Sequence, residues 1–215
     1  MTHTVLFVCS MNVCRSPLMQ WTFLDNLPES DQANFEVLSR GVDASSGQAI
    51  CELSAPMMWG SETGREFTES HASARLRPSD LVAPDLVIVA TRAEGSILSR
   101  QAPPLRRLTF TLREANLLGT KSTSAAERAF IVETEEAEGG PLPLHGFPHL
   151  LNRRRGTIVL PKPKSRRQRR VDPFDVPDAH LGRPSAHGTM LREVRTETKD
   201  LVSLFLQFRD QRPNS

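Results

Sequence analysis

The sequence of 215 residues contains no tyrosine, and aromatic residues make up only 6% of it. Its three cysteines are an odd number, which does not suit a secreted fold stabilised by disulfide bonds. No apolar run approaches the ~20 residues that a membrane-spanning helix needs, and no apolar signal segment follows Met1. We therefore expect one domain over residues 1–215, located in the cytoplasm and without a membrane partner.

The chain also lacks a large net charge: its formal charge of +2 does not indicate a nucleic-acid-binding protein. Basic residues are nevertheless concentrated in residues 153–170, which contain no acidic residue. Such a run is typical of a solvated loop, and alternatively it could steer acidic or phosphorylated partners. Nucleic acid is not expected as a partner, because no aromatic residues lie among the arginines to stack on bases.

Strand-like and helix-like apolar patterns alternate along most of the chain. Strands are predicted at residues 4–9, 35–39, 85–90 and 106–110. Helices are predicted at residues 17–27, 51–60, a stretch after Thr91, 113–118 and 185–209. This alternation favours an α/β fold of three layers (α/β/α), in which helices cover both faces of a four-stranded parallel sheet.

The last predicted helix carries an apolar stripe with helical period, which we expect to pack against the sheet. Its members are Leu191, Val194, Leu201, Phe205 and Phe208. Residues 121–170 do not fit the alternation and are predicted to be an insertion or extended loop region, basic at 153–170. Within it, Ser124 to Glu138 is predicted to be a helix, and the Gly- and Pro-rich stretch 139–148 a loop.

One short run near the N-terminus is more informative than the rest. Val5 to Val8 is continuously apolar, as in a strand buried on both faces of a parallel sheet. Ser16 and Pro17 then predict a helix start, with Ser16 as N-cap and Pro17 as first helical residue. The loop between them has Cys9 at one end and Arg15 at the other. It runs into a helix N-terminus, where free N–H groups and the helix dipole favour an anion.

These residues have the chemistry of a phosphate-binding nucleophile. A helix N-terminus and a nearby Arg15 lower the pKa of a thiol by ~1–5 units, which would make Cys9 a thiolate. The guanidinium can bind two phosphate oxygens at once. The Ser16 hydroxyl can donate to the thiolate and stabilise it as a leaving group. In the alternative interpretation Cys9 is an inert buried cysteine.

Val8 to Pro17 resembles the signature V-C-x-G-N-x-C-R-S-P of the low-molecular-weight protein tyrosine phosphatases and their arsenate reductase relatives, except at Met11. Other similar segments follow in the same order at residues 38–42, 70–76, 85–92 and 110–114, so that the matches cover about 4–118 and 172–208. The resemblance implies a phosphatase loop between the first strand and the first helix. It also implies hydrolysis of phosphotyrosine-containing proteins through a phosphocysteine intermediate, with inorganic phosphate as product and no metal or organic cofactor.

The resemblance assigns roles to the residues of this loop. Those expected to bind the phosphate are Ser10, Met11, Asn12, Val13, Cys14 and Ser16. Asn12 would adopt a left-handed backbone conformation, which asparagine tolerates. Ser39 and His71 would hold the loop from outside, although His71 could equally be an ordinary surface or capping histidine. In relatives the cysteine equivalent to Cys14 can form a reversible disulfide with the nucleophile.

The leaving group needs an acid, which in this family is an aspartate in an Asp-Pro motif before the last helix. Asp172 has the literal Asp-Pro sequence, followed by Phe174. Asp178 is preferred, because its neighbouring residues and its distance to the start of the last helix fit the family pattern better, although Ala179 replaces the usual proline. Both could also be solvated loop carboxylates. Phe174 or His180 could replace the tyrosines that line the substrate slot in relatives.

Two departures from the family, Met11 in the loop and Ala179 in place of the proline after Asp178, keep other functions open. If the loop needs a positive φ at Met11, that residue costs ~1–2 kcal/mol. A phosphate-binding module with weak or no activity is therefore one alternative. The other is an arsenate reductase, which needs a resolving cysteine pair. Cys51, predicted to be a core residue, is a poor candidate for it.

Overall fold

Four strands form a single parallel sheet at the centre of the protein. The computed structural model describes residues 2–157, 172–180 and 182–211. The strands are β1 (His3–Cys9), β2 (Phe35–Gly41), β3 (Leu86–Val89) and β4 (Thr109–Thr111). They are ordered β2-β1-β3-β4, and each neighbouring pair is parallel. The predicted α/β fold with a four-stranded parallel sheet is confirmed.

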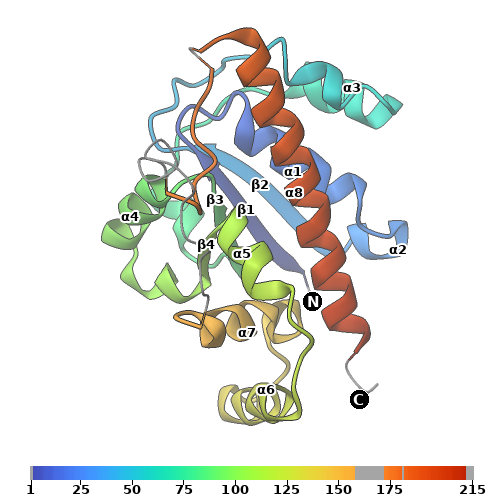
Figure 1. Ribbon diagram of the computed structural model, residues 1–215, viewed down its shortest axis with the longest axis vertical. Coiled ribbons are helices and arrows are strands. Elements are labelled where there is room, and N and C mark those ends of the chain that lie inside the picture. The colour runs from blue at the N-terminus through green and yellow to red at the C-terminus, as the bar shows by residue number, and fades with distance from the viewer. Residues whose placement is uncertain (1, 158–171, 181, 212–215) are drawn as a thin grey trace.

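Helices cover both faces of this sheet, so the protein has three layers (Figure 1). One face carries α1 (Arg15–Asp25), α5 (Leu112–Gly119) and α8 (Pro184–Asp210), and the other carries α4 (Arg92–Gln101). The other described helices are α2 (Glu29–Gln32), α3 (Glu62–Ser70), α6 (Ala125–Glu138) and α7 (Phe147–Arg154). Short 3-10 helices lie at Ala55–Met57, Pro78–Leu81, Pro103–Leu108 and Pro143–Gly146.

The continuous apolar run of β1 reflects its position inside the sheet. Val5 and Phe7 pack into the core under α1, α5 and α8, whereas Leu6 and Val8 pack toward Leu98 of α4. All four strand residues are 0% exposed. Because both faces of a central parallel strand are covered, neither set of alternating side chains can be polar.

The long helix α8 crosses one face of the sheet and contacts α1 and α5 (Figure 1). The predicted apolar stripe is buried along its whole length, from Leu191 to Phe208. Phe205 lies edge-on against Phe35 of β2 and Phe147 of α7. The stripe therefore joins the sheet, α1 and the region around α7 in one core, as the sequence predicted.

Several predicted segments differ from the structure, and proline explains two of these differences. Residues 51–60 contain only the 3-10 turn Ala55–Met57, because Pro56 lacks the N–H that an α-helix would use. The strand predicted at 106–110 begins at Thr109, because prolines at 103 and 104 start a 3-10 helix that runs to Leu108. The stretch 139–148 is a loop only in part, since α7 begins at Phe147.

Helix α6 is confirmed with Ser124 as its N-cap: the Ser124 hydroxyl accepts a hydrogen bond from the Glu127 N–H, and Gly139 ends the helix at φ 77°. At the N-terminus, α1 begins at Arg15 and not at Pro17 as predicted. Cys14 occupies the N-cap position without a side-chain capping bond. Ser16 does not cap the helix, because it is the second helical residue, and its hydroxyl contacts the Cys9 sulfur and the Arg40 carbonyl oxygen of β2.

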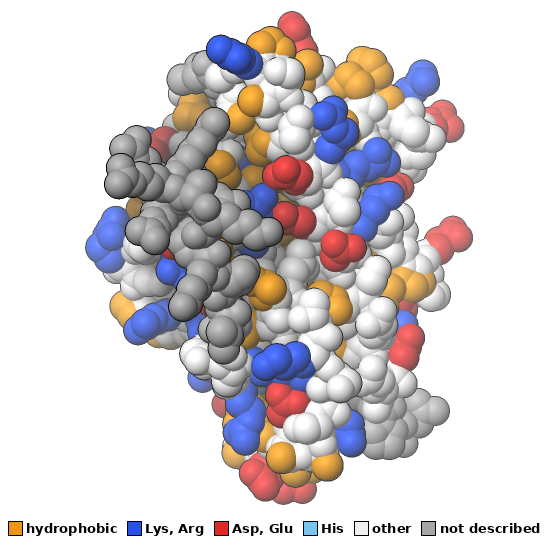
Figure 2. All heavy atoms as spheres, in the orientation of Figure 1, with side chains coloured by type: hydrophobic (Ala, Val, Ile, Leu, Met, Phe, Trp, Pro, Cys, Tyr) orange, Lys and Arg blue, Asp and Glu red, His pale blue; other side chains and the backbone are white. Residues whose placement is uncertain are grey.

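Two arginines of the basic segment, Arg154 and Arg155, hold the fold together, which corrects the solvated-loop prediction for them. Arg154 is 4% exposed and donates to both carboxylate oxygens of Glu127, at 2.7 and 3.0 Å. Arg155 donates to Glu114 at 3.1 Å and lies 4.1 Å from the centre of the Phe110 ring. The remaining basic residues at 162–170 lie outside the described residues. On the face that α8 crosses, basic and acidic side chains are interspersed (Figure 2).

Candidate active site

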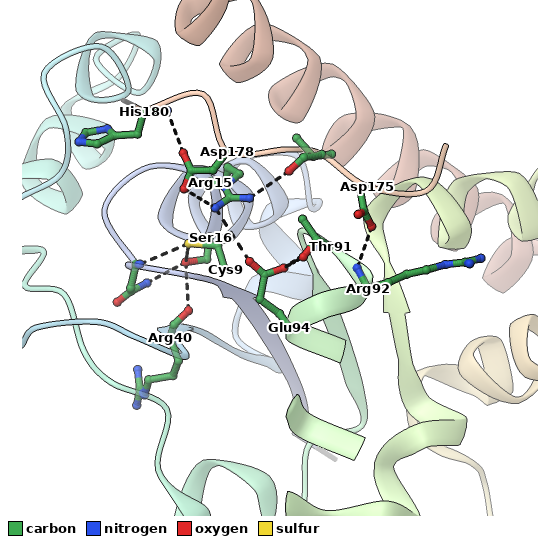
Figure 3. A network of polar contacts seen from close by, with 12 residues as sticks. Cys9, Arg15, Ser16, Arg40, Thr91, Arg92, Glu94, Asp175, Asp178 and His180 are labelled. Carbon is green, nitrogen blue, oxygen red and sulfur yellow. Dashed lines mark hydrogen bonds and ion pairs between the residues drawn. The ribbon is translucent and has the colours of Figure 1, made fainter. Parts of the chain in front are cut away.

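The candidate site lies at the carboxyl end of β1, where the chain turns from Cys9 into α1. The Cys9 sulfur accepts a hydrogen bond from the Asn12 backbone N–H at 3.3 Å and lies 3.1 Å from the Ser16 hydroxyl oxygen. Cys9 is 2% exposed. The sulfur is therefore not surrounded by apolar groups alone, since two hydrogen-bonding groups converge on it. Figure 3 shows Cys9 beside Ser16 and below Arg15.

Asn12 organises the loop from a left-handed backbone conformation, with φ 57° and no exposed surface. Its side-chain N–H₂ donates to Ser16 Oγ and to Ser39 Oγ, both at 2.9 Å. Its side-chain oxygen accepts the Ala74 backbone N–H at 2.8 Å. Its backbone oxygen lies 2.9 Å from His71 Nε2. Residues of three separate segments thus hold one residue of the loop.

The contact with His71 defines the state of that ring. Because a carbonyl oxygen only accepts, His71 Nε2 must carry the hydrogen. Burial lowers the pKa of His71 below 6.5, although the hydrogen bond to Asn12 opposes that shift. The structure therefore brings Ser39 and His71 to the loop as a pair of neutral hydrogen-bond partners, and His71 is not an ordinary surface residue.

Two further positions bear on the backbone of the loop: Met11 through its own conformation, and Gly41 through the close approach of the neighbouring strand. Met11 is half-buried, and it is not among the described residues with positive φ, so it does not carry the strain that the sequence suggested. Gly41 meets the loop without a side chain: a Cβ there would lie 2.5 Å from the Ser10 carbonyl oxygen and 2.9 Å from the Asn12 nitrogen. The glycine in the segment 38–42 is explained by this close approach.

Arg15 is almost completely buried, at 2% exposure, and has acceptors on two sides (Figure 3). It donates to the Val176 carbonyl oxygen at 3.0 Å and to Asp178 Oδ2 at 2.6 Å. Glu94 Oε1 lies 3.9 Å from the same guanidinium. This arrangement directs the guanidinium toward the mouth of the loop and the segment that carries Asp178.

Sequence reasoning missed Glu94. It is 5% exposed, accepts hydrogen bonds from the N–H and hydroxyl of Thr91 at the start of α4, and has a pKa raised mainly by its burial. The signal that could have found it is the spacing Thr-x-x-Glu after a strand, which is a capping box. What the spacing does not show is that this capping carboxylate also faces Arg15.

The two candidate aspartates lie in different places. Asp178 bonds to Arg15, and its side chain remains 44% exposed. Asp172 pairs instead with Arg92 Nη1 at 3.0 Å and accepts the Phe174 N–H at 3.0 Å. The Phe174 ring is buried under the Arg92 guanidinium, 4.5 Å from it, so it does not line an open slot.

A second cluster lies directly beside the loop. The donor atoms of Cys14, Cys51, His180 and His187 all lie within 4.8 Å of one another. A hydrogen bond from the Cys14 thiol lowers the pKa of Cys51 to about 5 and raises the pKa of Cys14. Cys51, predicted to be a core residue, is half-buried: it packs against the core and also adjoins these groups. Their separation in sequence gave no signal for this proximity.

Together the fold and the site define an α/β protein whose C-x5-R loop joins a buried parallel strand to a helix N-terminus. The chain belongs to the low molecular weight phosphotyrosine protein phosphatase family, whose model matches residues 4–115. The family implies a cysteine-based phosphatase with phosphoprotein substrates and phosphate as product. No helix within the described residues combines the length and apolar character needed to cross a membrane.

Individual relatives agree with this assignment. The protein-arginine-phosphatase of Bacillus subtilis (strain 168) is 31% identical over 110 residues, which are 51% of this chain and 70% of that protein. The arginine phosphatase YwlE from Geobacillus stearothermophilus has a similar structure, with a TM-score of 0.59, 18% identity and 99% of each chain covered. The tyrosine phosphatase Wzb from Escherichia coli K30, in complex with phosphate, has a TM-score of 0.56 at 15% identity, with 94% and 98% covered. At these identities the two structures show the shared fold.

Proposed function

We propose that this protein is a cysteine-dependent protein phosphatase that hydrolyses phosphotyrosine in proteins through a phosphocysteine intermediate. The observation that carries the proposal is the convergence of a backbone N–H and the Ser16 hydroxyl on the Cys9 sulfur, next to a buried Arg15. These groups place hydrogen-bonding partners beside the attacking sulfur, in a position where loop N–H groups can hold the phosphate.

In the first step, the Cys9 sulfur forms a bond to phosphorus while the bond from phosphorus to the tyrosine oxygen breaks. The electron pair of that bond goes to the leaving oxygen, which takes a proton from Asp178. Arg15 and the loop N–H groups bind the oxygens of the transferred phosphoryl group throughout. The contact between Asp178 and Arg15 supports this role, because it holds the carboxyl group beside the phosphate-binding guanidinium. Asp172 pairs with Arg92 instead of the phosphate-binding Arg15, which argues against the same role for Asp172.

In the second step, water attacks the phosphocysteine and gives its proton to Asp178, and the electron pair of the sulfur–phosphorus bond returns to Cys9. Ser16 assists because its hydroxyl has two possible acceptors, the Cys9 sulfur at 3.1 Å and the Arg40 carbonyl oxygen at 3.2 Å. The hydroxyl can therefore donate to the sulfur when it becomes a thiolate. A solved arginine phosphatase mutant with a phosphorylated active-site serine supports a covalent route in this fold.

A second candidate substrate is phosphoarginine, because the 31% identical relative is a protein-arginine-phosphatase. The chain has no tyrosine to line an aryl slot, and Phe174 is buried under Arg92. Cleavage of phosphoarginine would use the same groups: the Cys9 sulfur attacks phosphorus, and Asp178 protonates the departing guanidine nitrogen. The two candidate substrates differ only in which side chain, tyrosine or arginine, fits at the rim of the site.

The test compares the reduced full-length protein with three variants on p-nitrophenyl phosphate, a phosphotyrosine peptide and a phosphoarginine peptide. Cys9→Ser is expected to abolish turnover of all substrates. Asp178→Asn is expected to lower kcat by about 10²–10⁴-fold on phosphotyrosine, and less on p-nitrophenyl phosphate, whose leaving group needs little protonation. Asp172→Asn is the matched control and should stay within a few-fold of the parent.

Acid quenching during turnover should trap one phosphoryl group on a peptide containing Cys9, detected by mass spectrometry. A higher kcat/KM on the phosphoarginine peptide would select the second substrate. Phosphate binding without turnover would reject the enzyme in favour of a binding module. Thiol-dependent reduction of arsenate that exceeds phosphatase turnover would replace the proposal by an arsenate reductase.

A further inference from the structure

We propose that Cys14, Cys51, His180 and His187 form a zinc site beside the phosphate loop. The donor atoms of the four side chains lie within 4.8 Å of one another. Cys14 Sγ is 3.1 Å from His180 Nδ1, and Cys51 Sγ is 3.8 Å from His187 Nε2. Two sulfurs and two imidazole nitrogens are a donor set that binds Zn²⁺ in structural sites.

The four donors come from three distant parts of the chain, since only His180 and His187, seven residues apart, are near each other in sequence. Cys14 occupies the N-cap position of α1. Cys51 lies close to the same loop, because its backbone N–H donates to the Val13 carbonyl oxygen at 2.9 Å. His180 follows Asp178 in the loop before α8, and His187 lies in the first turns of α8. The two imidazole rings meet edge-on, with centroids 5.1 Å apart. Such a cluster is therefore a product of the fold and not of a local motif.

The geometry is close to what a tetrahedral zinc site needs. With Zn–S bonds of about 2.3 Å and Zn–N bonds of about 2.0–2.1 Å, neighbouring donor atoms lie about 3.3–3.8 Å apart. The most widely separated donor atoms, 4.8 Å apart at most, need to approach by about 1–1.5 Å. The exposed His180 can supply this movement, while Cys14 and His187 are each 4% exposed and held in the core. Thiols and imidazoles, without carboxylates among them, favour Zn²⁺ over Mg²⁺ or Ca²⁺.

Metal binding would tie the loop that carries Asp178 to the phosphate loop. The His180 backbone N–H donates to Asp178 Oδ1 at 2.8 Å, so a direct hydrogen bond links the two residues. Cys14 directly precedes Arg15, which is the partner of Asp178. A zinc ion held by both Cys14 and His180 thus keeps the Asp178–Arg15 contact formed. This consequence follows from the metal site and does not depend on which phosphorylated residue the protein acts on.

The experiment titrates the reduced, chelator-treated full-length protein with Co²⁺, whose visible absorption reports tetrahedral thiolate coordination, and then displaces it with Zn²⁺. We expect one metal ion per chain. His180→Asn and Cys51→Ser should each weaken Zn²⁺ binding by more than the roughly 10–100-fold that loss of an outer-shell partner costs. His180 is exposed, so its variant should fold even where Cys51→Ser does not.

Two matched controls locate the site. Cys9→Ser removes the other loop cysteine, and His149→Asn removes a histidine of α7 outside the cluster. Both should retain parental Zn²⁺ affinity and the tetrahedral Co²⁺ spectrum. The proposal is overturned if the parent shows no tetrahedral spectrum, if Cys9→Ser loses the metal, or if His180→Asn binds Zn²⁺ as tightly as the parent.

Discussion

Replacing Asn12 tests whether its hydrogen-bond network builds the phosphate loop. Asn12→Ala removes three side-chain hydrogen bonds, to Ser16, Ser39 and the Ala74 N–H. Each is worth about 0.5–1.5 kcal/mol, so about 3 kcal/mol is lost. Alanine at φ 57° adds about 1 kcal/mol of backbone strain. We expect the free energy of unfolding to fall by about 4 kcal/mol.

Asn12→Gly separates the two contributions. Glycine loses the same hydrogen bonds but accepts positive φ, so it should be about 1 kcal/mol more stable than the alanine variant. Asn26→Ala is the matched control: Asn26 makes one side-chain bond, to the Thr22 carbonyl oxygen at 2.8 Å, and should cost about 1 kcal/mol. The assay is urea unfolding followed by tryptophan fluorescence, together with phosphatase turnover.

The reasoning is refuted if Asn12→Ala is no more destabilising than Asn26→Ala. That result would mean that the contacts of Asn12 are replaced by water or by rearrangement at little cost. If the glycine variant is less stable than the alanine variant, the left-handed backbone is not the source of strain. Turnover should fall in both Asn12 variants, because the loop N–H that faces Cys9 belongs to this residue.

Other predictions follow from single contacts. Gly41→Ala should lower both stability and turnover, because its Cβ would lie 2.5 Å from the Ser10 oxygen; urea unfolding and kcat report the two effects. Glu127→Gln should cost about 1 kcal/mol at pH 7, since the carboxylate is partly solvated. The bond from Arg154 lowers the pKa of Glu127 from 4.5 to about 2, so this contribution is present above about pH 4.5. It is lost as pH falls toward 2, where urea unfolding should show the variant and the parent converging. Met11→Gly should leave stability unchanged or up to about 1 kcal/mol lower, and a clear gain in urea stability would contradict the absence of strain there.

The fold could be predicted from the sequence where the spacing of apolar residues within a segment matches the way that segment is buried. The apolar run of β1 and the helical stripe of α8 each carry the period of their own secondary structure, and both are buried as predicted. The errors at residues 51–60 and 106–110 arose where prolines favoured 3-10 turns over the structure that apolar spacing suggested. Arg154 shows a different limit, because a basic run predicts solvent exposure unless an acidic partner such as Glu127 is known to be near.

The C-x5-R spacing and the glycine, proline and apolar patterns are properties of neighbours along the chain. The sequence alone therefore determined the parallel α/β architecture and the C-x5-R loop between Cys9 and Arg15. Tertiary structure alone decided that Asp178, and not Asp172, lies on Arg15, that Glu94 faces the same guanidinium, and that two cysteines meet two histidines. The reason is that these contacts join segments whose approach depends on the packing of α4 and α8 on the sheet, and no local periodicity encodes such distances.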